Sequence, residues 1–148
     1  LHVRDLSRAG ESFGTEIPVV REREIGRAPI RLLDVPVGDG RYRVMLRVYD
    51  LAAIDGTRAV MRWRLDDGTQ YAGDTQLTLR TVGRCIVGPC WLPEPAGIAL
   101  PLFDKPLPPN LTQDHLHVEI EPLHPSSRLW AMVTVTNNET QQVTTITP

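Results

Sequence analysis

His115, His117 and Glu119 alternate with apolar residues, so an extended backbone places the two imidazoles and the carboxylate on one face. Groups that converge in this way can chelate Zn²⁺, and His124 in the following turn is a candidate further ligand. The exposed face of any strand also carries polar side chains, and histidine and glutamate meet that need without binding anything. We therefore expect no bound metal or cofactor, and these residues remain the alternative metal site.

Both cysteines lie in one short segment, Cys85-Ile-Val-Gly-Pro-Cys90. A structural zinc site normally needs a second such pair or nearby histidines. A redox-active dithiol favours a tighter Cys-x-x-Cys spacing beside a helix start. Free thiols and a metal site stay open as alternatives, but we predict a local disulfide that pins the Gly-Pro loop. Such a bond indicates an oxidising compartment.

The basic residues are almost all arginine, with fifteen arginines and one lysine, Lys105. A central hairpin formed by residues 41–51 and 58–65 would point several arginines outward, and a nearby strand would add one more. This candidate ligand or partner face consists of Arg43, Arg47, Arg62, Arg64 and Arg80. Guanidinium groups fork onto carboxylates, so such a face can bind acidic polysaccharide or an acidic protein. Glu119 and Glu121 are available as partners within the same sheet, and we expect internal pairing to be the main use.

Motifs for catalysis are absent from the sequence. There is no Gly-x-Ser-x-Gly elbow, no glycine-rich phosphate loop and no His-Glu-x-x-His. The net charge of −2 gives no general attraction to nucleic acid, and no apolar stretch is long enough to span a bilayer. We predict that the protein is not an enzyme. The enzyme alternative would be metal-dependent and would use His115, His117 and Glu119.

The elements that carry these residues follow from a two-residue alternation of apolar and polar side chains. This is the period of a β-strand, and no segment shows the period of an amphipathic helix. Turn residues such as Gly38-Asp39-Gly40 and Asp67-Gly68 separate the alternating segments. The predicted strands span residues 15–22, 29–35, 41–51, 58–65, 75–82, 97–103, 111–121, 128–136 and 142–147.

These eight or nine strands predict an antiparallel β-sandwich that is Ig-like in the broad sense. The connections are too short for helical crossovers, and the strand spacing is typical of a sandwich. Trp63 is the expected core aromatic, because it shares an apolar face with Ala59 and Met61. The thirteen prolines argue against a closed, regular barrel. We expect an N-terminal extension at residues 1–14 and a single domain at residues 15–148.

Three segments resemble a known group of domains. They are Phe13-Gly-Thr-Glu-Ile-Pro18, Arg43-Val-Met-Leu-Arg-Val-Tyr-Asp50 and residues 129–148. They are similar to uncharacterised Ig-like β-sandwich modules in exported proteins of environmental bacteria, notably acidobacteria. The resemblance implies export and a non-catalytic role. It assigns no functional residue, and the Cys85–Cys90 loop is not part of it.

Self-assembly is the expected mode of action, with protein partners or copies of this chain joined through sheet edges. The chain begins at Leu1 rather than Met, as expected of a processed mature protein or a trimmed form. Its N-terminal segment, residues 1–12, could add a strand to a neighbouring copy, and the predicted strand at residues 15–22 is the expected open sheet edge for such pairing. Capture of an acidic polysaccharide or protein by the arginines is the alternative. We expect the protein at the cell surface, in the periplasm or outside the cell.

The cysteine prediction is checked by mass spectrometry of the unreduced protein. A Cys85–Cys90 bond makes the protein lighter than its reduced form by the mass of two hydrogen atoms. Thiol reagents should then label neither cysteine until a reductant is added. Labelling of both thiols without reductant would contradict the bond and remove this sign of export.

Overall fold

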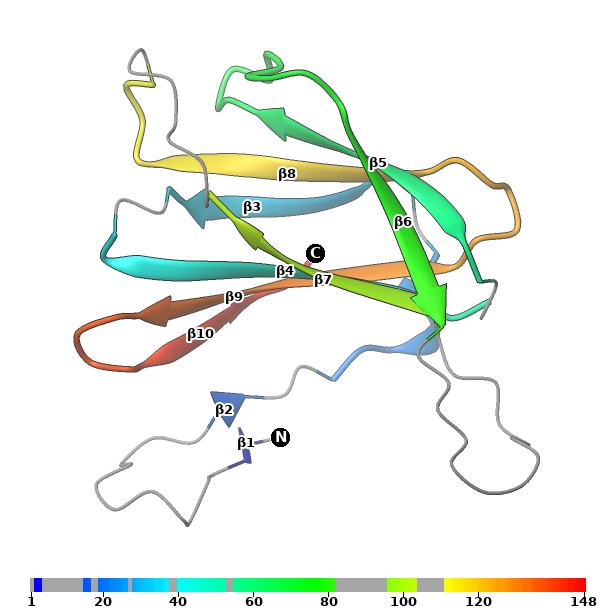
Figure 1. The fold of residues 1–148 in the computed structure, drawn as a ribbon, viewed down its shortest axis with the longest axis horizontal. Coiled ribbons are helices and arrows are strands. Elements are labelled where there is room, and N and C mark those ends of the chain that lie inside the picture. Colours follow the sequence, from blue (N-terminus) through cyan, green and yellow to red (C-terminus); the bar gives the residue numbers. More distant parts are fainter. Residues whose placement is uncertain are drawn as a thin grey trace.

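The structure is a computed structural model that describes residues 2–3, 15–16, 19–26, 28–37, 40–52, 55–81, 96–103 and 111–148. Cys85 and Cys90 lie outside these residues, so their disulfide stays a prediction. Figure 1 shows the arrangement of the strands. They are β1 (His2–Val3), β2 (Thr15–Glu16), β3 (Ile30–Pro36), β4 (Tyr42–Asp50), β5 (Thr57–Arg64), β6 (Thr75–Thr81), β7 (Ala96–Leu102), β8 (His115–Pro122), β9 (Leu129–Asn137) and β10 (Val143–Ile146), with one 3-10 helix, η1 (Glu22–Glu24).

Strands β3 to β10 form one antiparallel sheet in the order β10-β9-β4-β7-β6-β5-β8-β3, while β1 and β2 form a separate pair. β6 joins the two halves of the large sheet: residues 75–79 pair with β5, and Arg80 and Thr81 pair with β7. The outermost strands, β3 and β10, lie close together without pairing in the described chain. The predicted all-β antiparallel fold is confirmed. The strands form a nearly closed, barrel-like sheet, and the two separate layers of the predicted sandwich are not confirmed.

The prolines argued against a closed, regular barrel, and the sheet is nearly but not fully closed, because β3 and β10 do not pair in the described chain. The prolines inside strands lie where a ladder tolerates a missing N–H group. Pro36 lies in β3, which pairs on one side only. Pro101 lies in a part of β7 that pairs with β4 alone, and Pro122 ends β8 where that strand pairs with β5 alone. They therefore leave the shared hydrogen bonds of the curved sheet intact.

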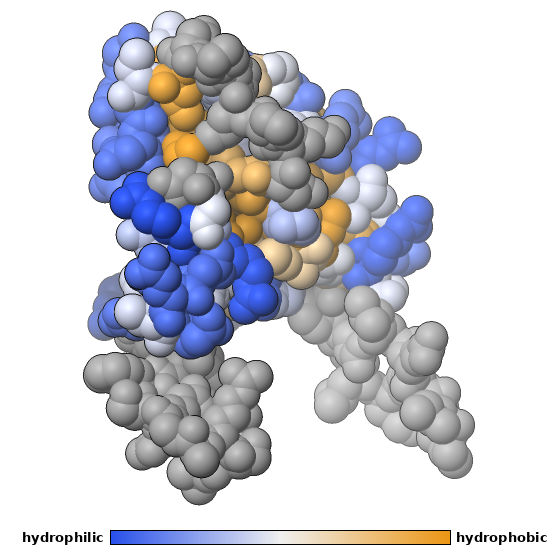
Figure 2. Space-filling model, turned by 60° about the vertical axis from the view of Figure 1, so that its left-hand side comes forward, coloured by the Kyte–Doolittle hydropathy of each residue, from blue (hydrophilic) through white to orange (hydrophobic). Residues whose placement is uncertain are grey.

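The core follows the predicted alternation. Side chains from both halves of the sheet meet inside it, and the fully buried ones include Leu32, Leu46, Val48, Leu79, Leu116, Val118, Ile120 and Val133. Trp63 is only partly buried and packs against this cluster, with its ring 4.9 Å from that of Phe103, centroid to centroid. On the side where β3 ends and β4 begins, apolar residues lie between hydrophilic flanks (Figure 2). Within the described residues, no helix has the length and apolar character to cross a membrane.

Two predicted elements are wrong. Residues 41–51 and 58–65 do not form a hairpin, because β4 pairs with β7 and β9 whereas β5 pairs with β6 and β8. The expected strand at residues 15–22 is also shorter, since β2 ends at Glu16 and Glu22 already belongs to η1. Both errors concern strand pairing. The alternation within one segment does not predict which strand it pairs with or where the pairing ends.

Asp50 makes the corner at which the chain passes from β4 to β5. Its carboxylate is fully buried. Oδ1 accepts hydrogen bonds from the backbone N–H groups of Ala52 (3.0 Å) and Arg128 (2.9 Å), and Oδ2 accepts one from the Thr57 hydroxyl (2.8 Å). One side chain therefore ties the end of β4 to the starts of β5 and β9. The burial of Asp50 could have been predicted from the sequence, because it occupies the next inward position after Val44, Leu46 and Val48.

We predict that Asp50→Ala lowers the free energy of unfolding by about 3 kcal/mol, since the buried Thr57 hydroxyl and two partly buried backbone N–H groups lose their acceptor. Urea denaturation measures this loss. Asp74→Ala is the matched control: Asp74 is a half-exposed partner of Arg62, and its removal should cost below about 1 kcal/mol. Equal losses in the two variants would show that the corner is not held by Asp50.

Candidate functional site

The two predicted histidines lie in a cluster of carboxylates on the outer face of β8. His115 Nε2 lies 3.0 Å from Asp66 Oδ1, and its Nδ1 lies 2.8 Å from Asp114 Oδ1. His117 Nε2 lies 3.2 Å from the same oxygen of Asp66. Asp34 belongs to a bulge in β3, and its backbone N–H donates to His117 Nδ1 (3.1 Å). The cluster therefore links β3, β8 and the turn after β5.

Hydrogen bonding gives the two histidines different surroundings. A backbone N–H can only donate, so His117 Nδ1 accepts the hydrogen bond from Asp34, while its Nε2 faces Asp66. His115 instead has a carboxylate beside each ring nitrogen. The hydrogen bond to Asp114, helped by the charge of Asp66, raises the pKa of His115 above its ordinary value of 6.5. The same bond lowers the pKa of Asp114 below 3.8.

This arrangement does not suit a metal ion. A histidine that ligates a metal through Nε2 normally donates its Nδ1–H to an acceptor, but His117 Nδ1 faces the N–H of Asp34. The third candidate, Glu119, lies against Arg31 (3.4 Å), Arg62 (3.8 Å) and Arg64 (3.2 Å). In the described part of the chain, no three His, Cys, Asp or Glu side chains are grouped to hold a metal.

The five candidate arginines do not form one strip. Arg62 lies 2.6 Å from Glu121 and 3.2 Å from Asp74, and the hydrogen bond to Glu121 raises the pKa of Arg62. Arg64 pairs with Glu119, as above, and Arg80 lies 3.5 Å from Asp55. The expected internal pairing thus holds for these three side chains.

Arg43 and Arg47 lie apart from the other candidates. They project outward from β4, which β7 and β6 separate from β5 in the sheet. Arg47 donates to the hydroxyl of Thr134 (2.7 Å) rather than to a carboxylate. The predicted face therefore divides into a neutralised part on β5, β6 and β8 and a cationic part on β4.

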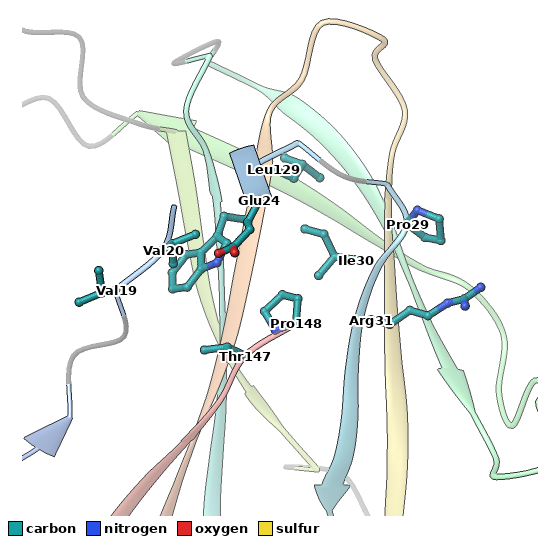
Figure 3. A pocket seen from close by; sticks show the side chains of 10 residues that line it. Val19, Val20, Glu24, Pro29, Ile30, Arg31, Leu129, Thr147 and Pro148 are labelled. Carbon is teal, nitrogen blue, oxygen red and sulfur yellow. The ribbon is translucent and has the colours of Figure 1, made fainter. Parts of the chain in front are cut away.

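A further surface, which the sequence did not reveal, lies at the seam between β3 and β10. A pocket of about 490 Å³ opens there, lined mainly by apolar side chains with Glu24 and Arg31 (Figure 3). Its walls come from residues 19–24, the starts of β3 and β9, and the two residues that follow β10. Alternation within a strand does not predict a site built from strand ends.

Asp34, Asp66 and Asp114 are the cluster residues to which the sequence gave no role beside the histidines. Asp66 directly precedes the Asp67-Gly68 turn, and Asp34 reaches the histidines through the bulge between Leu32 and Val35. A smaller pocket of about 370 Å³ adjoins the cluster, lined by Leu33, Arg64, His117 and their neighbours.

Comparison of the chain with family models, curated proteins and solved structures finds no match. The site must therefore be interpreted from its own geometry.

The His115 bridge predicts a pH dependence of stability. Because the folded-state pKa of His115 is raised, its contribution is complete below about pH 6.5 and disappears as the pH rises through the higher folded value. The difference in unfolding free energy between wild type and His115→Gln should therefore shrink as the pH rises above about 6.5, as followed by urea denaturation. His124→Gln, at an exposed turn, is the control. A difference that grows with pH would contradict the assignment.

Proposed function

We propose that this domain is a non-catalytic structural module of the cell envelope or extracellular space, which assembles with copies of itself through the open edge of β10. The observation that carries the proposal is the incomplete closure of the sheet: β10 pairs with β9 on one side and has no strand on its other side in the described chain. An edge of this kind offers unpaired backbone groups to another strand.

The edge of β10 is suited to accept a strand. Asn137 N donates to Gln142 O (2.9 Å), and the alternation of an antiparallel ladder then turns the backbone groups of Thr144 and Ile146 toward β9. The groups of Val143 and Thr145 consequently face the open side. All four residues of β10 are β-branched, uncharged and free of proline, so nothing in its sequence blocks pairing.

The edge of β3 is protected by comparison. Val37 N donates to Asp114 O (2.8 Å), so the register places the backbone nitrogen of Pro36 on the open side, where it has no hydrogen to donate. The bulge at Asp34, with a φ of 54°, also breaks the regular spacing. β3 and β10 cannot form a regular ladder with each other, which leaves β10 as the acceptor.

The N-terminal strands are the proposed donor. β1 and β2 pair only with each other in the described chain, and β2 lies against β10. An isolated two-stranded sheet is marginal in water and gains stability when it joins a larger one. If the N-terminal strands of one copy join the β10 edge of another copy, the two copies exchange an element, which is a low-cost route to assembly. The N-terminal segment of one copy can therefore extend the sheet of the next.

The cellular setting rests on the sequence. The resemblance to modules of exported proteins and the predicted Cys85–Cys90 bond both favour an oxidising, extracytoplasmic location. The non-catalytic role is supported by the geometry of the histidine cluster, because His115 and His117 have their ring nitrogens engaged by Asp34, Asp66 and Asp114.

We predict that the intact chain forms concentration-dependent oligomers and that Thr145→Pro abolishes them. The substitution removes an N–H group that faces the open side, so the unfolding free energy should change by no more than about 1 kcal/mol. Light scattering after size-exclusion chromatography measures the mass of the assembly. Thr145→Val, which keeps the N–H group, is the matched control and should assemble normally.

Deletion of residues 1–12 tests the donor separately. It should leave a folded monomer that no longer assembles on its own. An intact chain that stays monomeric at its highest soluble concentration would contradict the proposal. Oligomers that survive the deletion but not Thr145→Pro would keep the acceptor edge and exclude the N-terminal donor.

A further inference from the structure

The outer face of β7, β4 and β9 carries a second arrangement, which is independent of the β10 edge. The strand registers place outward side chains in rows across the sheet. The rows are Gly97–Tyr49–Trp130, Ala99–Arg47–Met132 and Pro101–Met45–Thr134, with Arg43 beside Thr136 in the next row. Small residues on β7 thus lie beside large aromatic, methionine and arginine side chains on β4 and β9.

The aromatic row forms a flat shelf. A Cβ atom at Gly97 would lie 3.2 Å from Cδ1 of Tyr49 and 3.6 Å from its Cε1, so the tyrosine ring occupies the space above the glycine backbone. Trp130 stacks beside Tyr49, with ring centroids 6.1 Å apart and planes inclined by 19°. Trp130 also lines the seam pocket with Val20 and Glu24, so the shelf reaches from Gly97 on β7 to that pocket.

The charge on this face has one sign. Arg43 and Arg47 are the only charged residues at outward positions in the described lengths of β4, β7, β9 and β10. On the outer face of β5 and β8, in contrast, Arg62 and Arg64 pair with Glu121 and Glu119, which leaves Arg58 as a single exposed charge. Among the described strands, the β4 face therefore offers a polyanion two neighbouring positive charges with no carboxylate at an outward position beside them.

We propose that this face binds a carboxylated polysaccharide. Arg43 and Arg47 are four residues apart on one strand, roughly 13 Å, so a ligand that reaches both must be a polymer with repeated negative charges. Guanidinium groups pair well with the carboxylates of uronic acids. The negative face of an aromatic ring attracts the C–H groups of a sugar ring, which gives Tyr49 a role that an acidic peptide would not need.

Affinity electrophoresis of the intact protein through gels that contain polygalacturonate tests this proposal. We expect retardation at low salt that weakens as salt screens the charges. The double variant Arg43→Gln/Arg47→Gln should bind at least tenfold more weakly. Arg58→Gln removes one charge from an exposed position on β5 and should change binding less than twofold. Circular dichroism and thermal melting confirm that each variant is folded.

Two further probes identify the class of ligand. Tyr49→Leu should weaken binding to polygalacturonate while leaving any interaction with poly-glutamate unchanged. Neutral dextran should not retard the protein. The proposal is overturned if polygalacturonate causes no retardation at low salt, if Arg58→Gln matches the loss in the double variant, or if poly-glutamate binds as tightly as the polysaccharide. The last result would assign the face to acidic proteins instead. Thr145→Pro should bind the polymer normally, so this test is separate from that of assembly.

Discussion

The buried carboxylate of Asp50 is the constraint on which the arrangement of both outer faces depends. It accepts hydrogen bonds from groups at the starts of β5 and β9, so it holds the chain at the point where β4 ends. Because the chain turns away there, β5 joins β6 and β8 instead of folding back on β4. The separation of Arg47 from Arg62, and of the cationic face from the neutralised one, follows from that corner.

Local alternation predicted which way side chains point, and the register between distant strands decided what they meet. The sequence placed His117 and Glu119 correctly on the outer face of β8, because apolar neighbours fix that orientation. It could not show that Glu119 meets Arg64 across the β5–β8 ladder, or that a bulge brings Asp34 to His117. The corner at Asp50 was missed for a different reason: a charged residue at a buried position is exceptional.

The outer face of β5 and β8 and the outer face of β4 differ in how they depend on salt and pH. On β5 and β8, arginines and carboxylates neutralise one another across strands, and each exposed pair adds little stability because water and salt screen it. The nearby histidine cluster adds a dependence on pH, since His115 holds Asp66 and Asp114 best when its ring is protonated. On β4, the arginines lie beside aromatic and methionine side chains instead of acids. Positive charge there remains available to a ligand, at the expense of a stronger dependence on ionic strength.

The open seam follows from the sequence of β3 and not from a lack of neighbouring chain. β3 and β10 lie close enough to meet, yet Pro36 lacks a donor and the Asp34 bulge interrupts the spacing that a ladder requires. Closure within one molecule is therefore blocked on the β3 side, while β10 keeps regular spacing and, within the described chain, N–H groups on its outer edge that pair with no strand. The proposed pairing with an added strand would use this one regular edge. It would also give the proposed assembly a direction, because each copy would accept a strand at β10 and offer one from its N-terminal segment.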